Sequence, residues 1–485
     1  MAALTCFVVD CNLPNAPPII SDLTLGGQPI SAYFQNASGA ADLGFTFDWS
    51  RRGMLSPSSQ SNDGAVSQDE LLDGLARVLG TSAASNRPSV ALMLAGRYDQ
   101  APGQYGFMFD VDRPDGLPGY RQGCALFLQA IWTKFFLQPE AARDAAFREA
   151  VAYIAVHELG HVFNLWHEGD GDNSFMKTHP TPERFGDLCF NTLQRGYLAL
   201  AVDSSTAAFV IPGPGCEPFG TLAPGFSSSD SSAFAGPAEK VSGLEFRVAL
   251  SHDSFWSFEP IELDLELHLP QAAAAPIAIP DEIDPGYSTL RIWITRPDGE
   301  RFRYRPQTRF CSANGERAIM PGGTIRRDIA ITRQSGGYTF TMAGEYQVEA
   351  SFHHPSGGVL LSNSVTCEVL RANPASGKWI EASRVLQNAT AQRLLRFKRW
   401  VPSHYECARL ARFADDTASP ATSAAIDYAL GKSLLRMAER VPHDDYSRDL
   451  RRRGASHLKH ALDGLRLSPH RADITTNLLD ALSEQ

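Results

Sequence analysis

Two histidines and a glutamate stand at a spacing suited to metal chemistry in residues 157–161, which read HELGH. Residues four apart lie about 40° apart around an α-helix. His157 and His161 therefore project from one face and can reach one metal ion. Glu158, one step along the helix, points to the side of such an ion, where its carboxylate can take a proton from water. The pattern predicts a metal site with a general base beside it.

A third histidine, His167, follows six residues after His161. On one straight helix it would point about 120° away and stand about 9 Å further along the axis, so the helix has to end first. Asn164 lies where that turn is required, and asparagine is second only to glycine in adopting the left-handed conformation that ends helices. Three neutral imidazoles with a fourth position open to water are typical of catalytic Zn²⁺. We therefore expect zinc on all three histidines.

Residues 157–167 resemble the signature of the metzincin zinc endopeptidases, HExxHxxGxxH followed by a methionine in a tight turn, with Asn164 at the glycine position. The resemblance implies that Met176 is this methionine, close to the metal site. It also implies a zincin fold, of α+β class, for the domain. In that clan an edge strand of the sheet binds the substrate in extended form, which points here to residues 124–128.

No single family within the clan is indicated. The short spacing from His167 to Met176 is similar to the matrixins, whereas Glu168, directly after the third histidine, is similar to the astacins. Thr178 stands where some families carry a tyrosine, so the role of that tyrosine does not transfer to this chain. We expect a metzincin-like site with mixed features.

Three weaker patterns lie outside the motif at 157–167. In the thermolysin-like gluzincins a glutamate on a later helix completes the metal site, and Glu183 with Asp187 has the corresponding spacing. Residues 170–173, DGDN, could bind calcium but lack the rest of a twelve-residue calcium loop, which favours a polar turn. Cys11 and the residues after it resemble a matrixin cysteine switch without its arginine. Replacing His167 and Glu183 in turn separates the first alternative from the metzincin interpretation.

The elements that must position these residues fall in a predicted peptidase domain over residues 1–205. Pro139 and Glu140 begin a long helix that becomes apolar on nearly every side from residue 151, so its second half should be buried. Strand patterns precede it at 90–95, 105–109 and 125–128, and a capping box opens an amphipathic helix over 67–80.

The rest of the chain changes character twice. Residues 206–242 are rich in Pro, Gly and Ser and predict a linker. Residues 243–371 alternate apolar and polar side chains, as in 261–269, and predict an immunoglobulin-like β-sandwich. From 372 to 485, apolar helical patterns such as 421–440 and 446–465 predict a small helical bundle.

Composition excludes several classes. At 485 residues, with 43% apolar and 20% charged residues, the chain is an ordinary multidomain globular protein. A formal charge of -10 argues against a nucleic-acid partner, and no apolar run reaches the roughly 18 residues of a membrane span. The N-terminus has no basic segment before an apolar run, so we expect a cytoplasmic protein or one exported by a leaderless route. The eight cysteines leave free thiols and disulfides both open.

Together these patterns predict a zinc-dependent endopeptidase that acts on protein or peptide substrates. Two other classes remain open: a zinc hydrolase acting on a different amide, and a binding or adhesion protein with a vestigial peptidase domain. The intact Glu158 argues against the vestigial interpretation. The sandwich and helical domains, which show no site of their own, are expected to bind substrate or a protein partner.

Overall fold

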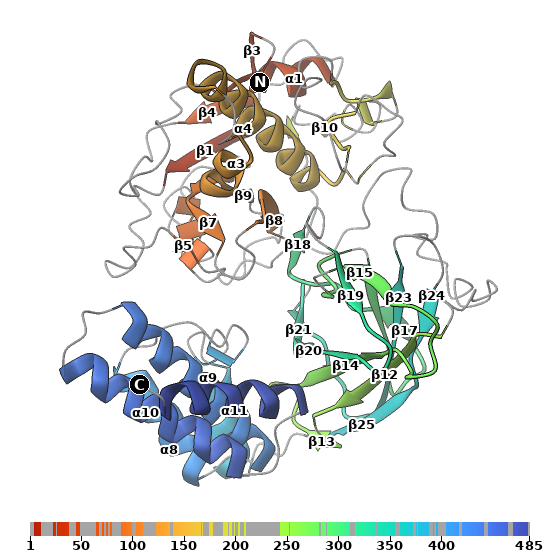
Figure 1. Ribbon diagram of the computed structural model, residues 1–485, viewed down its shortest axis with the longest axis vertical. Coiled ribbons are helices and arrows are strands. Elements are labelled where there is room, and N and C mark those ends of the chain that lie inside the picture. The colour runs from red at the N-terminus through yellow and green to blue at the C-terminus, as the bar shows by residue number, and fades with distance from the viewer. Residues whose placement is uncertain are drawn as a thin grey trace. The chain divides into compact units, whose positions relative to one another are not determined.

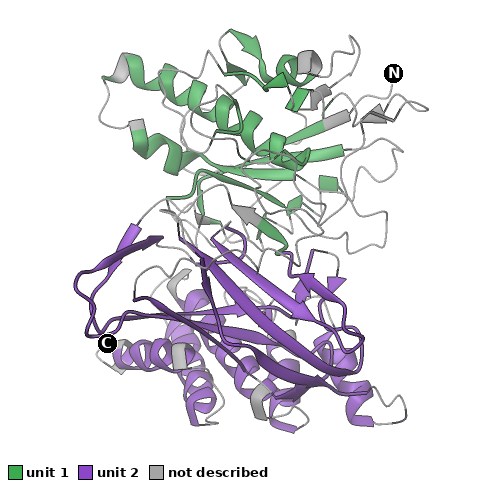
Figure 2. Ribbon diagram, turned by 90° about the vertical axis from the view of Figure 1, so that its right-hand side faces the viewer, with its two compact units in different colours: residues 1–236, 306–314 green, residues 237–305, 315–485 purple. Residues whose placement is uncertain are grey.

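The computed structural model divides the chain into two compact units, residues 1–236 with 306–314 and residues 237–305 with 315–485 (Figure 2). The structure describes residues 4–10, 23–25, 27–37, 45–48, 65–66, 70–71, 74–75, 78–79, 89–98, 103–109, 123–135, 139–165, 167, 174–177, 188–192, 194–195, 198, 202–203, 208–209, 243–251, 253–280, 283–287, 289–310, 316–335, 337–354, 359–371, 375, 377–387, 391, 394–395, 404–416, 420–440, 445–463 and 469–483.

Unit 1 is built on a six-stranded mixed sheet with the order β18-β8-β9-β6-β1-β4. The three strands β4, β1 and β6 run parallel to one another, and β9 continues the parallel set. The last two strands, β8 and β18, are antiparallel to their neighbours. The strands are β1 (Leu4–Asp10), β4 (Phe45–Asp48), β6 (Ser89–Ala95), β8 (Gly106–Phe109), β9 (Gly123–Phe127) and β18 (Thr308–Phe310).

Both faces of this sheet are buried, because its strands are apolar at nearly every position. Successive side chains of a strand point to opposite faces. Val90 and Leu92 accordingly join one core, whereas Ala91 and Met93 join another. The first core is shared with the long helix α4 (Glu140–Val162), and the second with helical residues between 71 and 79. Of the capping box predicted at 67–70, only Glu70 lies within the described residues.

Shorter elements complete unit 1. Helices α1 (Ile30–Ala37) and α3 (Leu128–Phe135) pack with α4 (Figure 1). Three two-stranded pairs are β2 (Thr24–Leu25) with β3 (Gln28–Pro29), β5 (Ala65–Val66) with β7 (Arg97–Tyr98), and β10 (Val202–Asp203) with β11 (Ala208–Phe209). The linker predicted over 206–242 lies outside the described residues except for 208–209.

Unit 2 begins with two mainly antiparallel sheets that share one core. The alternation predicted at 261–269 is realised, since Leu263, Leu265 and Leu267 are buried in that core. One sheet contains β12 (Glu245–Leu250), β14 (Glu262–His268) and β20 (Thr324–Ala330). The other contains β13 (Ser254–Phe255), β25 (Val365–Val369), β23 (Gly344–His353), β16 (Leu290–Thr295) and β17 (Arg301–Arg303), with β24 (Val359–Leu361) on β23. Smaller pairs are β15 (Ile277–Pro280) with β19 (Glu316–Ile319) and β21 (Arg333–Gln334) with β22 (Gly337–Tyr338).

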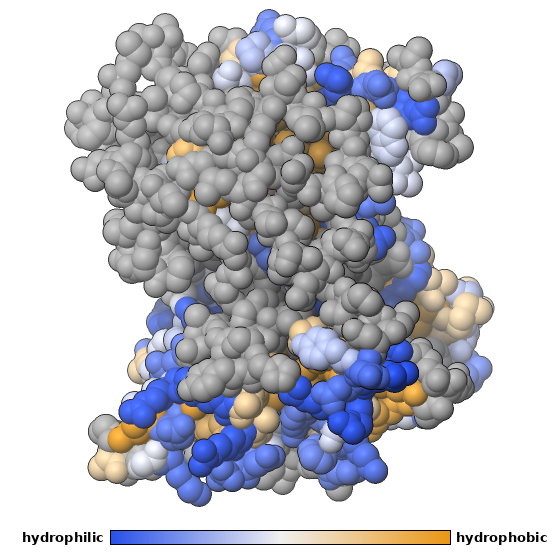
Figure 3. Space-filling model, turned by 90° about the vertical axis from the view of Figure 1, so that its left-hand side faces the viewer, coloured by the Kyte–Doolittle hydropathy of each residue, from blue (hydrophilic) through white to orange (hydrophobic). Residues whose placement is uncertain are grey.

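Helices follow the sheets in unit 2, as the sequence predicts. They are α6 (Gly377–Leu386), α8 (His404–Asp416), α9 (Pro420–Arg440), α10 (Asp445–Asp463) and α11 (Pro469–Ser483). Helices α9 and α10 approach closely at Gly431 and Gly454, where a Cβ on either residue would lie 3.0 Å from the other's carbonyl oxygen. On the face of the molecule in Figure 3, hydrophilic side chains predominate at the lower end, with hydrophobic side chains between them. No helix within the described ranges is long and apolar enough to cross a bilayer.

Candidate metal centre

The last two turns of α4 bring His157 and His161 together with His167 in unit 1. The Nε2 atom of His161 lies 3.2 Å from Nε2 of His157 and 3.2 Å from Nε2 of His167. Tetrahedral zinc with Zn–N bonds of about 2.0–2.1 Å separates its nitrogen ligands by about 3.3 Å. The three side chains are 5%, 5% and 6% exposed. The spacing of these nitrogens therefore fits one zinc ion.

Asn164 ends α4 in the way that the spacing predicts. It has a φ of 73° and is the one described non-glycine residue with a positive φ. The amide of Leu165 donates to the carbonyl of Gly160 at 2.9 Å, and the amide of Asn164 donates to that of His161 at 2.9 Å. These two bonds define a Schellman motif with Asn164 in the left-handed position. The reversal returns the chain so that His167 faces the two helix histidines.

Backbone carbonyls orient two of the imidazole rings. His157 Nδ1 lies 2.7 Å from the carbonyl oxygen of Phe175, and His161 Nδ1 lies 2.8 Å from that of Leu165. A carbonyl oxygen only accepts, so each neutral ring carries its proton on Nδ1 and turns its Nε2 lone pair inward. Burial lowers the pKa of His157 to about 4, against a smaller upward effect of the Phe175 carbonyl. The neutral ring is the form that binds a metal.

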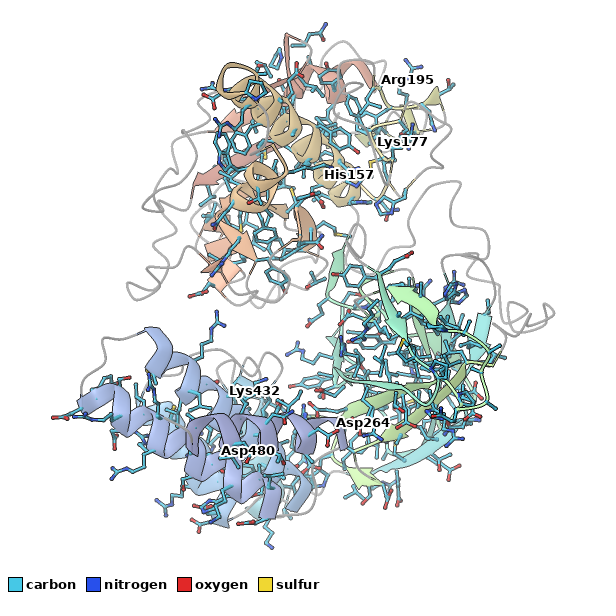
Figure 4. The ribbon with its side chains drawn as sticks, in the orientation of Figure 1. His157, Lys177, Arg195, Asp264, Lys432 and Asp480 are labelled. Atoms are coloured by element: carbon cyan, nitrogen blue, oxygen red, sulfur yellow. The ribbon has the colours of Figure 1, made fainter. Side chains whose placement is uncertain are left out.

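Tyr153 is a residue of this site that the sequence reasoning missed. It lies one turn before His157 on α4 and is buried. Its hydroxyl donates to the carbonyl oxygens of Phe175 at 3.1 Å and Lys177 at 3.0 Å, and it lies 3.3 Å from His157 Nδ1. Figure 4 shows His157 and Lys177 in the same part of unit 1. Tyr153 thus ties the helix that carries His157 to the turn that carries Met176.

Met176 lies in a buried turn over 174–177, in which the amide of Lys177 donates to the carbonyl of Ser174. Its sulfur is so close to Gly160 that a Cβ on this glycine would overlap it. The Ser174 hydroxyl accepts from the amide of Met176 at 3.0 Å and donates to Gln194 Oε1 at 2.7 Å. The two hydrogen bonds of the Ser174 hydroxyl therefore hold this turn in place. The turn packs Met176 against the helix that carries His157 and His161.

Glu158, the residue after His157 on α4, lies against β8 on the antiparallel side of the sheet. It is 1% exposed, and a Cβ on Gly106 of β8 would lie 2.7 Å from its Oε1 atom. The carbonyl of Gly106 accepts from Gln104 Nε2 at 2.6 Å, and Gln104 is itself buried. A glycine at this position of β8 is what allows the carboxylate to lie against the strand. Neither Gly106 nor Gln104 was singled out in the sequence.

One prediction about this region is wrong. The resemblance placed the substrate-binding edge strand around 124–128, but β9 is an interior strand between β6 and β8. Its five residues are all buried, because both of its neighbours supply hydrogen bonds and both of its faces are packed. The strand beside the site on the antiparallel side is β8, and β18 lies outside it.

The other candidates of the sequence lie outside the described residues. These are Glu183 and Asp187 of the gluzincin alternative, the DGDN segment at 170–173, Cys11, Glu168 and Thr178. Within the part of the chain that the structure describes, the three histidines form the one group of three or more potential ligands that could hold a metal ion. Among the described cysteines, Cys6, Cys124, Cys189 and Cys367 are free thiols.

No family model matches the sequence, and no curated protein matches it. Crystal structures of OgpA from Akkermansia muciniphila align over 76% of this chain and 92% of that chain, with 12% identity and a TM-score of 0.25. One further structure, of catalytically inactive OgpA with an O-glycopeptide substrate, has a TM-score of 0.23 over 76% and 93% of the two chains, at 12% identity.

Spo0M, a sporulation control protein from Bacillus subtilis, aligns over 30% of this chain with 13% identity and a TM-score of 0.18. This alignment spans about half of Spo0M, 56% of its chain. TM-scores this low do not allow a function to be transferred from these structures. The function of this chain therefore has to follow from its own residues.

Proposed function

We propose that the chain is a zinc-dependent endopeptidase of the metzincin type, with His157, His161 and His167 as zinc ligands and Glu158 as the general base. The observation that carries the proposal is the convergence of three buried Nε2 atoms, two of their rings having Nδ1 on a carbonyl oxygen. This donor set and spacing suit Zn²⁺ with an open fourth position. The order of the residues, HELGH with a third histidine six positions on, supports peptide hydrolysis through the metzincin resemblance.

In this proposal, zinc supplies the Lewis acidity that polarises the scissile carbonyl and makes water acidic enough to react near neutral pH. Glu158 takes the proton of the attacking water, holds it, and transfers it to the nitrogen of the leaving amine. Burial of this carboxylate against Gly106 limits exchange of the proton with bulk water between the two transfers. Tyr153 and the carbonyls of Phe175 and Leu165 keep the histidine rings oriented.

The test compares Glu158→Gln with Glu149→Gln, a matched change at an exposed position of the same helix. Each zinc-loaded protein is incubated with an unfolded protein substrate, and bound zinc is measured in parallel. We expect Glu158→Gln to keep one zinc per chain and to cleave roughly 10²–10⁴-fold more slowly, while Glu149→Gln matches the wild type. Cleavage by Glu158→Gln at the wild-type rate would remove Glu158 from the mechanism.

Two outcomes point to the other function classes. If zinc binds and peptides stay intact while a small non-peptide amide is hydrolysed with dependence on Glu158, the protein is a zinc hydrolase of another kind. If zinc binds and no amide is hydrolysed, the domain is a vestigial peptidase in a binding protein. Binding of substrate or partner by unit 2 remains a prediction from its sequence.

A further inference from the structure

A strand from a distant part of the sequence covers the edge of the sheet beside Glu158. Strand β18 pairs antiparallel with β8, with Arg309 opposite Met108. Residues 306–314 belong to unit 1, although the chain on both sides of them, up to 305 and from 315 onward, belongs to unit 2. The outermost strand of unit 1's sheet is thus supplied by a segment between β17 and β19 of the sandwich.

The direction of the backbone groups of β8 follows from one hydrogen bond. The amide of Phe127 donates to the carbonyl of Tyr105 at 2.8 Å, so this pair is hydrogen-bonded in the ladder with β9. Hydrogen-bonded and non-hydrogen-bonded pairs alternate along an antiparallel ladder. Phe107 and Phe109 therefore also face β9 with their backbone groups, and Gly106 and Met108 face the other way, toward β18.

The two residues of β8 whose backbone groups face away from β9, Gly106 and Met108, both have partners. Met108 stands opposite Arg309 of β18, and the carbonyl of Gly106 accepts from Gln104 Nε2 at 2.6 Å. Gly106 is also the residue that lies against Glu158. Two strand residues span about 7 Å, so the pairing position at Met108 is one step along the strand from the carboxylate. A peptide that added to β8 while passing Glu158 would need the backbone groups of Met108.

We propose that residues 306–310, which contain β18, act as a tethered strand that competes with the substrate for the edge of β8 and keeps the peptidase latent. This rests on the proposed function. An extended peptide gains its affinity for a sheet edge from backbone hydrogen bonds, and β18 uses those hydrogen bonds within the same chain. A segment held at both ends by unit 2 competes at a high effective concentration. Only peptides that pair well enough to displace it reach Glu158.

The experiment removes one backbone donor of β18. Arg309→Pro deletes the amide that faces Met108, and Arg309→Ala is the matched control, because it shortens the side chain and keeps the amide. Both are made in the full, zinc-loaded chain, and kcat and KM are measured with an unfolded protein substrate. Loss of about one net hydrogen bond is expected to raise kcat/KM of Arg309→Pro about two- to tenfold over Arg309→Ala, mainly by lowering KM.

The outcomes separate this proposal from the proposed function. Equal kcat/KM in the two variants, or slower cleavage by a folded Arg309→Pro, overturns the tethered-strand proposal. The proposed peptidase function is then unaffected, and β18 is a strand that stays paired with β8 when substrate binds. Absence of cleavage by wild type and both variants defeats the proposed function itself, and the competing strand with it.

Amide hydrogen exchange gives an answer that does not depend on whether Arg309→Pro folds. The zinc-loaded Glu158→Gln protein, which holds substrate without cutting it, is measured with and without an uncleaved unfolded protein. Displacement predicts faster exchange over 308–310 on binding, with β9 unchanged. Binding that leaves exchange over 308–310 unaltered overturns the proposal.

Discussion

Two buried polar clusters, one in each unit of the molecule, are built on opposite principles. In unit 1, the Nε2 atoms of His157 and His167 each lie 3.2 Å from Nε2 of His161. In unit 2, the guanidinium of Arg471 on α11 lies between Glu262 and Asp328, on strands β14 and β20, and over the ring of Tyr428 at 4.8 Å. Arg471 and Glu262 are 3% and 4% exposed at the side chain.

The difference lies in what completes each cluster. The carboxylates of unit 2 meet an opposite charge from their own chain, so that cluster fastens the last helix to the sheet. In unit 1 the lone pairs of like groups point at one another, an arrangement that a cation stabilises. A buried polar cluster thus indicates a metal site when its donors are alike and convergent, and a structural clamp when its charges are complementary.

The largest effect is expected from His167→Ala. Removal of a direct ligand should lower zinc affinity by more than the 10–100-fold that follows loss of an outer hydrogen-bond partner, and activity should fall to background. Zinc affinity is measured by competition with a chelating dye, beside Glu183→Gln as the gluzincin control and His460→Ala at an exposed position. Loss of zinc in Glu183→Gln with zinc retained in His167→Ala would reverse the assignment of the third ligand.

Arg471→Met should break the clamp of unit 2 and leave the metal centre intact. Removal of one partner of a buried ion pair costs about 3–5 kcal/mol, because the remaining carboxylates are left uncompensated. The control is Arg326→Met, whose partially exposed pairs with Glu266 and Asp473 should be worth at most about 1 kcal/mol. Denaturant unfolding and zinc titration are recorded on the same samples. Equal destabilisation by the two substitutions would show that the clamp is no stronger than a surface pair.

Tyr153→Phe tests how strongly the surroundings of the metal centre orient its ligands. The ring is kept, while the hydrogen bonds to the carbonyls of Phe175 and Lys177 are lost. We expect zinc affinity to fall about tenfold. Tyr33→Phe, which removes a 2.7 Å hydrogen bond to the carbonyl of Leu25, is the control and should leave zinc affinity unchanged. A Tyr153→Phe protein with wild-type affinity would remove Tyr153 from the site.

The smallest effect concerns how the stability of each unit depends on pH. Burial lowers the pKa of His157 to about 4 and, with Arg291 and Arg303, that of His353 in unit 2 to about 4. Between about pH 6.5 and 4 the unfolded chain binds more protons at these histidines than the folded chain does. The stability of each metal-free unit should therefore decrease as the pH is lowered, by at most about 1.4 kcal/mol per pH unit for each histidine.

Zinc should make the two units differ, because it holds His157 neutral and has no site on His353 among the described residues. Unfolding is followed across this pH range with and without zinc, and His353→Asn is included. We expect zinc to alter the pH dependence of unit 1 alone and His353→Asn to flatten that of unit 2. A zinc effect on unit 2 of the same size would contradict the separation.

Much of the metal centre was predictable, because its determinants are local. The four-residue spacing of His157 and His161 follows from helix geometry. The need for a turn before His167 follows from the same geometry, and Asn164 takes the left-handed conformation at a φ of 73°. The mainly antiparallel strands of unit 2 likewise follow from an alternation that can be read within a few residues.

What surrounds the centre was decided by contacts between distant residues. The Tyr153 hydroxyl contacts backbone carbonyls more than 20 positions away. Every residue has a backbone carbonyl, so these partners cannot be recognised from the sequence. Gly106 is one of 39 glycines in the sequence, and only its approach to Glu158 gives it a role. Strand β18 has three residues and pairs with β8 about 200 positions earlier.

The sequence by itself therefore determined the proposed ligands, the proposed base and the turn between them, since these depend on the fixed geometry of one helix and the backbone preference of one asparagine. The tertiary structure alone decided which residues orient the histidines, where Glu158 rests and what covers the sheet edge beside it. These depend on packing and on backbone hydrogen bonds, which almost any residue can make.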